Sequence, residues 1–273
     1  MRYTIGDGPR KSPPLKLRAL AVYALLLGIK GVSRAFFRHR VERVGEFPAD
    51  AWEHARIGVL LNHTSLFEPV FAGSCPNAFL RKLATDGAIP IADVTLRRPL
   101  AGILFRSIAA QVIEITRKRD ASWSAVLASI RPGSLVVIMP EGRMMRRGGL
   151  DKDGRPMTVR GGIADLIQAT DSGYMILGYS GGLHHVQAPG ERFPRLFRTV
   201  RMNFECIDVA AYRAALESED GPRGFKLAVV RDLERRRDLH CPATEETGRP
   251  LRREECEDTA PVTASSRGAP REE

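Results

Sequence analysis

Short apolar runs along the chain alternate with segments whose apolar residues recur at helical spacing. The runs predict β-strands and the segments between them predict α-helices. The predicted strands are 57–61, 112–116, 135–139, 174–179 and 199–205, and the predicted helices between them are 65–73, 98–109, 120–130 and 159–170. This alternation predicts a single α/β domain with a mixed, mostly parallel sheet flanked by helices. In such domains ligands gather at the carboxyl ends of the strands.

Near the N-terminus, residues 19–29 form an uninterrupted apolar run with cationic flanks. Lys16 and Arg18 precede the run and Lys30 follows it. The run itself is too short to span a bilayer and has no cleavage site of small residues, whereas its cationic ends suit anionic lipid headgroups. We therefore expect residues 1–45 to be an amphipathic segment at the membrane interface. Packing of the same helix on the domain core is the alternative.

The C-terminal part of the chain changes character at about residue 240. Residues 225–239 combine helical spacing with many basic side chains and predict a last helix. Residues 241–273 are rich in Pro, Thr, Ser, Glu and Arg and almost lack large apolar residues, which predicts a disordered tail. The globular domain is therefore expected to cover residues 46–240.

The overall charge favours anionic partners. The chain has 42 Lys and Arg residues against 32 Asp and Glu residues, a formal net charge of +10. Lipid headgroups, phosphorylated substrates and nucleic acid would all satisfy this charge. Nucleic acid is disfavoured, because the basic residues are not interleaved with aromatic side chains that could stack on bases. The four cysteines form no CxxC pair, which indicates free thiols and no metal site.

The first predicted strand ends in a polar turn that contains a candidate catalytic pair. In the sequence LNHTSLFEP, His63 directly follows the strand and Glu68 comes five residues later. If Thr64 or Ser65 caps the next helix, Glu68 can fold back towards His63. A carboxylate bonded to one imidazole nitrogen fixes the tautomer and makes the other nitrogen a better general base. The alternative is an ordinary turn in which Glu68 is only a carboxylate at a helix N-terminus.

The next two predicted strand ends add cations and a glutamate. Arg117 opens a run of three cations after one strand, and Glu141, Gly142 and Arg143 follow the other. Arginines beside a base could hold a phosphate by charge-assisted hydrogen bonds while the base acts on a neighbouring hydroxyl. A solvated surface charge is the alternative for each of these arginines.

Together, these segments resemble a known family. NHTSLFEP, EITRK and MPEGRMMR, in this order and spacing, look like the first three sequence blocks of the glycerolipid acyltransferases, which include the lysophosphatidic acid acyltransferases (1-acyl-sn-glycerol-3-phosphate acyltransferases). The resemblance spans residues 57–179. Arg160 and the two glycines after it resemble a basic step that follows the third block.

The resemblance implies an enzyme of phospholipid biosynthesis. Its members move a fatty acyl group from acyl-CoA or acyl carrier protein to a hydroxyl of a lysophospholipid-like acceptor. The acyl thioester is a co-substrate, and no separate cofactor is expected. The partners would be this donor, an anionic lysolipid acceptor and the membrane, with the protein peripheral on the cytoplasmic face.

The resemblance also implies residue roles. His63 would be the general base that takes the proton of the acceptor hydroxyl, and Glu68 its carboxylate partner. The acceptor site would be formed by four further residues: Arg117, which would bind the phosphate, and Glu141, Gly142 and Arg143.

The sequence departs from the family pattern in four places. Residues 109–111 lack the glycine often seen before the second block, residues 176–182 lack the proline-valine character of the fourth block, and two single positions differ. Glu68 stands where aspartate is usual, and Arg143 stands where threonine or serine is usual. These departures make an acceptor other than lysophosphatidic acid a realistic expectation.

Two other functions remain open from the sequence. Ser180 lies in a GxSxG motif, with Asp208 and His240 following in the order of an α/β-hydrolase triad. Against a serine esterase, the segment after Ser180 contains two prolines and no helical pattern, although this motif requires a helix directly after the serine. The other alternative is a membrane-surface lipid-binding protein without catalytic activity.

Overall fold

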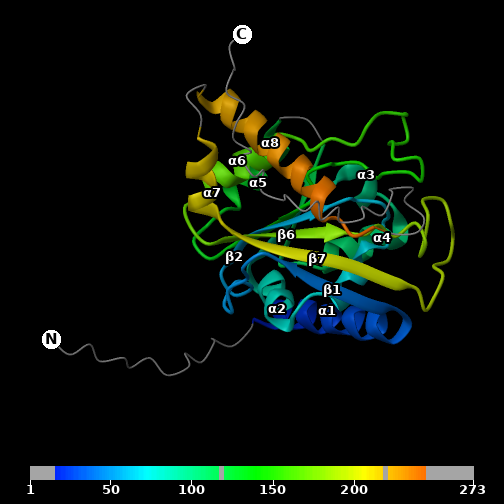
Figure 1. Ribbon diagram of the computed structural model, residues 1–273. Helices are drawn as coiled ribbons and strands as arrows, with labels where there is room; N and C mark the ends of the chain where they lie inside the picture. The colour runs from blue at the N-terminus through cyan, green and yellow to red at the C-terminus, as the bar shows by residue number, and fades with distance from the viewer. Residues whose placement is uncertain (1–15, 117–119, 218–220, 244–273) are drawn as a thin grey trace, which may run out of the picture.

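The computed structural model describes residues 16–116, 120–217 and 221–243. Residues 244–273, most of the predicted disordered tail, lie outside the described residues, as does Arg117. The described chain forms an α/β domain around a seven-stranded sheet of order β1-β7-β6-β2-β5-β3-β4 (Figure 1). The strands are β1 Arg38–Val44, β2 Ala55–Leu61, β3 Gly87–Ala92, β4 Gln111–Ile115, β5 Leu135–Ile138, β6 Tyr174–Ser180 and β7 Thr199–Asp208.

The sheet is mixed and mostly parallel, which confirms the predicted fold class. Only β6 and β7 pair in antiparallel fashion, so β7 and its parallel neighbour β1 run against the other five strands. The carboxyl ends of β2, β5, β3, β4 and β6 therefore meet at one edge of the sheet. That edge is where the sequence placed the candidate site.

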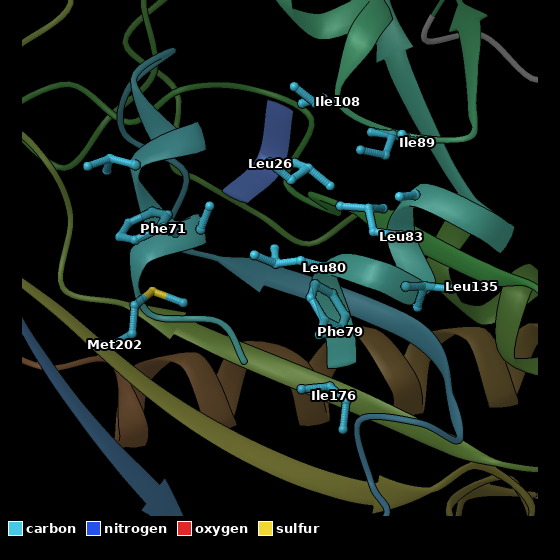
Figure 2. Packing of buried hydrophobic residues seen from close by; sticks show 14 of the residues in the cluster. Leu26, Phe71, Phe79, Leu80, Leu83, Ile89, Ile108, Leu135, Ile176 and Met202 are labelled. Atoms are coloured by element: carbon cyan, nitrogen blue, oxygen red, sulfur yellow. The ribbon is translucent and has the colours of Figure 1, made fainter. Parts of the chain in front are cut away.

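Helices cover both faces of the sheet (Figure 1). The helices are α1 Leu17–Phe36, η1 Glu68–Gly73, α2 Asn77–Asp86, α3 Asp93–Leu96, α4 Pro99–Ser107, α5 Ala121–Ala128, α6 Gly162–Ala169, α7 Val209–Leu216 and α8 Gly221–His240. Helices α1, η1, α2 and α4 pack on one apolar cluster, and α5 to α8 pack on a second. Figure 2 shows the first cluster, which includes Leu80 and Leu83 of α2, Ile176 of β6 and Leu135 of β5.

The structure differs from the sequence predictions in two strands and four helices. Helices α2, α3 and α7 were not predicted. β1 and β3 were not predicted: β1 (RHRVERV) is a largely exposed edge strand without an apolar run, and β3 (GAIPIA) contains a proline and a glycine. The helix predicted at 65–73 is a short 3-10 helix, η1, with Pro69 in its first turn. Proline suits a helix start but lacks an amide hydrogen for the next turn.

Helix α1 is longer than the apolar run from which it was predicted. By length and composition it could cross a membrane, a test that core helices and signal sequences also pass. It packs on the domain through Val22, Leu26 and Ser33, which are buried. Lys30 of α1 donates hydrogen bonds to the Cys75 carbonyl oxygen and to Asn77 Oδ1, at 2.8 and 2.6 Å. One side of α1 is thus fixed to the domain, while most of its surface faces outward.

Candidate active site

His63 and Glu68 form a hydrogen-bonded pair at the end of β2. His63 Nδ1 lies 2.7 Å from Glu68 Oε2, and Glu68 Oε1 accepts a hydrogen bond from the Thr64 amide at 3.0 Å. The His63 side chain is 13% exposed and that of Glu68 only 3%. With Nδ1 turned to the carboxylate, Nε2 is the imidazole nitrogen that can act on a substrate. The predicted approach of Glu68 to His63 is present.

Glu68 reaches the imidazole because η1 begins at this residue. The turn between β2 and η1 is short, so both oxygens of the carboxylate have partners within it: the ring of His63 and the backbone of Thr64. A carboxylate fixed at both oxygens holds the ring in one orientation. The longer side chain of glutamate therefore fits the geometry of a general-base pair in this turn.

Glu141 holds the His63 turn through hydrogen bonds with its backbone amides. Its carboxylate accepts hydrogen bonds from the amides of His63 and Asn62, at 2.8 and 3.3 Å. Asn62 has a positive φ of 66°, a conformation that asparagine tolerates better than most residues. The bend directs both amides at Glu141. Of the predicted acceptor residues, Glu141 thus shapes the turn that carries His63.

Arg237 of α8 neutralises the buried Glu141. Its Nη1 lies 3.1 Å from Glu141 Oε1 and also donates to the Met157 carbonyl oxygen at 3.0 Å. The Glu141 side chain is 1% exposed and that of Arg237 is 15% exposed. Burial by itself lowers the pKa of Arg237, but the charges and hydrogen bonds of Glu141 and Asp238 together outweigh it and the pKa is raised. A buried carboxylate needs such a partner, because an isolated buried charge is strongly unfavourable.

A largely apolar cavity of about 470 Å³ opens beside His63. Ring and carboxylate of the His63–Glu68 pair both line it, and its apolar wall includes Ile89, Phe105 and Trp123. Its lining continues over β3, α4 and β5 to α6. Cavities of this kind, apolar with a few polar groups, accept small ligands with long apolar parts.

Two cationic side chains line the same cavity, Arg160 and Lys226. Arg160 Nε donates to the Glu141 carbonyl oxygen at 3.3 Å, and Lys226 Nζ lies 3.0 Å from Asp165. Gly142 lines the cavity next to Arg160, and its positive φ of 62° favours glycine. The cavity therefore joins an apolar wall, a base and two cations.

Arg143 points to a different partner from the one predicted. It forms an ion pair with Asp151, whose side chain is 1% exposed. The pKa of Asp151 is lowered to about 2, chiefly by the hydrogen bond that it accepts from the Arg155 amide and also by Arg143. Arg143 thus stabilises the long loop after β5, and the cavity lining does not include it. Its predicted role in binding an acceptor stays a prediction, as does that of Arg117.

Three side chains, those of Arg237, Lys226 and Trp123, were not predicted to belong to the site. Arg237 and Lys226 lie in the predicted basic final helix, and Trp123 lies in the helix predicted at 120–130. No local motif marks them, because they reach the site through the packing of α5 and α8 against α6.

The residues of the serine-esterase alternative do not come together. Ser180 is fully buried, and its hydroxyl accepts a hydrogen bond from the Gly182 amide at 2.9 Å. The register of β6 with β7 places Asp208 opposite Tyr174, at the other end of β6 and about 20 Å from Ser180 at strand rise. A triad is therefore not formed. In the described part of the chain, no cluster of three or more His, Cys, Asp or Glu residues could hold a metal ion.

Comparisons with known proteins agree with this geometry. Residues 47–179 match the Acyltransferase family model. Among solved structures, the chain is similar to the 1-acyl-sn-glycerophosphate (LPA) acyltransferase, PlsC, from Thermotoga maritima. The TM-score is 0.50 at 18% sequence identity, over 81% of this chain and 84% of that one. A search of curated proteins finds no match. The family match covers the His63 turn and Glu141, and the structural match reports on the fold.

Proposed function

Residues 47–179 form an Acyltransferase-family domain of the glycerolipid acyltransferase type, and on this premise we propose that the protein transfers a fatty acyl group from an acyl thioester to a hydroxyl of a lysolipid-like acceptor. The observation that carries the proposal is the His63–Glu68 pair at the wall of an apolar cavity. The cavity supplies room for an acyl chain, and the pair supplies a base at its rim.

In the proposed reaction, the acceptor hydroxyl attacks the carbonyl carbon of the thioester. His63 Nε2 takes the hydroxyl proton as the new C–O bond forms. The C–S bond then breaks, and the thiolate leaves and receives that proton, which restores neutral His63. Glu68 stabilises the imidazolium during the step, because its carboxylate lies 2.7 Å from Nδ1.

Cations beside the cavity support an anionic acceptor or donor. Arg160 and Lys226 line the cavity, and charge-assisted hydrogen bonds from such groups bind phosphate. We assign Arg117 to the same task on sequence grounds, since it comes two residues after the last residue of β4 and lies outside the described residues. Acyl-CoA and acyl carrier protein both present a thioester, and the proposal covers both donors. We further propose a peripheral position on the cytoplasmic face of the membrane, where a lysolipid acceptor would reside.

The test is acyl transfer by the purified full chain, followed by mass spectrometry of the lipid product. Long-chain acyl-CoA and lysophosphatidic acid serve as the first pair, and other lysolipids as further acceptors. His63→Ala should lower turnover by about 10²–10⁴-fold, the usual contribution of a positioned base. The matched control is His54→Ala, because the His54 side chain is 65% exposed and remote from the cavity lining.

Two outcomes would contradict the proposal. Undiminished transfer by His63→Ala would remove the mechanism. If Ser180→Ala lost activity while His63→Ala kept it, the hydrolase would be favoured instead.

A further inference from the structure

Three large apolar side chains stand in solvent on the loop between β6 and β7. Phe193 is 73% exposed, Leu196 45% and Phe197 62%. Phe36, the last residue of α1, is 40% exposed, and its ring centroid lies 6.2 Å from that of Phe197. We call residues 191–198 the apolar loop. Contiguous exposed apolar patches usually mark a binding surface.

The apolar loop is fixed in place by its backbone. The Phe197 amide donates to the Phe36 carbonyl oxygen at 2.7 Å, and the Arg38 amide donates to the Arg198 carbonyl oxygen at 3.0 Å. Phe197 has a φ of 60°, an unfavourable conformation for a bulky residue. Such strain persists only where the surrounding structure holds it. The loop thus keeps its aromatic side chains outward at the cost of backbone strain.

Cations surround the apolar side chains. Arg192, Arg195 and Arg198 belong to the loop, and Arg34 and Arg38 lie at the adjoining end of α1; all five are exposed. Glu191 is the one acidic residue of the apolar loop and pairs with Arg195 at 2.5 Å. Aromatic rings flanked by arginines suit the headgroup region of a bilayer, where rings bury shallowly and guanidinium groups meet phosphate.

Hydrogen bonds join this loop to the His63 turn. Arg195 Nη1 donates to the His184 carbonyl oxygen at 3.3 Å, and His184 Nε2 is 2.8 Å from the Met145 carbonyl oxygen. The Met145 amide in turn donates to the His63 carbonyl oxygen at 2.8 Å. In Figure 1 the segment between β6 and β7 extends beyond the arrowhead of β6, at the edge where α4 also lies. A surface that binds the apolar loop would therefore lie near the candidate site.

We propose that the apolar loop and the adjoining end of α1 insert into the headgroup region of an anionic lipid bilayer and hold the His63 edge of the sheet at the membrane surface. This surface deepens the proposed function, since it explains how a membrane-resident acceptor would reach the cavity. A second copy of the chain fits the same surface less well. Self-pairing would bring the arginines of two copies together, and like charges across an interface oppose association.

The experiment is co-sedimentation of the full chain with vesicles of phosphatidylcholine alone or mixed with phosphatidylglycerol. Wild type should bind the mixed vesicles more strongly. Phe193→Asp should weaken this binding at least tenfold, because a phenylalanine that would insert into the bilayer is replaced by a charge that the anionic surface repels. Leu227→Asp on α8 is the matched control, because Leu227 is also apolar and 49% exposed. It should bind like wild type.

A second variant reports insertion directly. Phe193→Trp should gain fluorescence quenching by lipids brominated on the acyl chain, beyond the quenching of the native Trp52 and Trp123 in wild type. Unchanged vesicle binding by Phe193→Asp would overturn the proposal. So would a lipid-free dimer that Phe193→Asp converts to monomer, since a second copy would then occupy the surface.

The same variants separate this proposal from the proposed function. Vesicle binding that depends on Phe193, in a protein without transferase activity, would support the surface and refute the function. If both proposals hold, wild type and Phe193→Asp should be equally active on detergent-dispersed acceptor. A difference in their activity on vesicles would then support both the function and the surface. If wild type and Phe193→Asp were equally active on vesicles and bound them equally well, the proposed function would stand and the proposed membrane surface would be overturned.

Discussion

Helices α1 and α8 each contain 20 residues and flank the domain at opposite ends of the described chain, yet they serve it in opposite ways. The apolar helix, α1, leaves most of its surface exposed and packs on η1 and α2. The polar helix, α8, buries Phe225, Val229 and Leu233 and sends Arg237 to the carboxylate beneath His63. Hydropathy alone would have assigned the inner position to α1.

The difference teaches that a basic helix can be part of a site when its charges have buried partners. In α8, Arg236 pairs with Glu205 and Asp232, while Arg237 pairs with Glu141. The exposed leucines of α1 carry no charge, so ion pairs of this kind do not explain why they face outward. An outward apolar helix next to the apolar loop is explained by the proposed membrane surface.

Among the changes that test this contrast between α1 and α8, removing Arg237 should have the largest effect on stability and activity. Arg237→Met leaves the Glu141 charge buried without its guanidinium, which should lower the free energy of unfolding by about 3–5 kcal/mol. The His63 turn would also shift, and kcat should fall by at least about tenfold. Denaturant unfolding and steady-state kinetics measure the two effects.

Arg235→Met is the matched control, because Arg235 on the same helix is 62% exposed and its partner Asp232 keeps a second ion pair with Arg236. It should change stability by less than about 1 kcal/mol. Adding Glu141→Gln to Arg237→Met should recover part of the lost stability, since the orphaned charge is then gone. Equal effects of Arg235→Met and Arg237→Met would contradict the assigned role of Arg237.

Core truncation should separate the two helices next. Leu233 is fully buried on α8, and Leu233→Ala should cost about 2–5 kcal/mol in the free energy of unfolding. Leu20 is 51% exposed on α1, and Leu20→Ala should change it by less than about 0.5 kcal/mol. Similar losses for both would mean that the outer side of α1 is covered in the lipid-free protein.

Lys226 tests whether α8 contributes to substrate binding. The side chain lines the cavity and is 31% exposed, so Lys226→Met removes a cation without opening the core. We expect KM to rise by about fivefold, the equivalent of about 1 kcal/mol, with kcat nearly unchanged. Steady-state kinetics with varied acceptor and donor would show which substrate it contacts. An unchanged KM for both would remove Lys226 from the binding site.

The smallest expected effect concerns the attachment of α1 at low pH. His39 bonds Ser33 of α1 and Ser74, and burial lowers its pKa below the ordinary 6.5. As the pH falls below 6.5, the unfolded chain takes up the proton more readily than the folded chain, so stability declines and levels off below the folded pKa.

Unfolding curves at several pH values measure this decline, which His39→Gln should reduce. The exposed His54→Gln should leave it unchanged. A decline of equal size in wild type and His39→Gln would place the titrating group elsewhere.

The sequence predicted the fold to the extent that apolar runs carry it. Four of the five located strands have consecutive Val, Ile, Leu or Met residues, and β7 was located by apolar residues that alternate with polar ones. β1 has no such run, since an edge strand with exposed side chains needs no apolar face, and its pairing with β7 joins residues far apart in sequence. The switch of β7 to the antiparallel direction likewise depends on how the chain returns, which local pattern does not encode.

The candidate site was predictable where its residues are close in sequence. His63 and Glu68 share one turn, so their contact followed from spacing and capping. Glu141 was identified by motif, but its partner was not, because Arg237 lies 96 residues further along the chain. Arg143 was assigned to the acceptor, whereas the structure pairs it with Asp151 eight residues on. Loops of this length fold according to their own polar contacts.

The contact between Arg237 and Glu141 also sets an order of events during synthesis. A nascent chain acquires β2, the His63 turn and Glu141 long before α8 has been translated. Since a domain folds as a unit during synthesis, Glu141 can be buried with its arginine only after residue 237 has left the ribosome. Until then, the carboxylate beneath His63 has to remain hydrated. Catalytic competence is therefore acquired last, with the final helix.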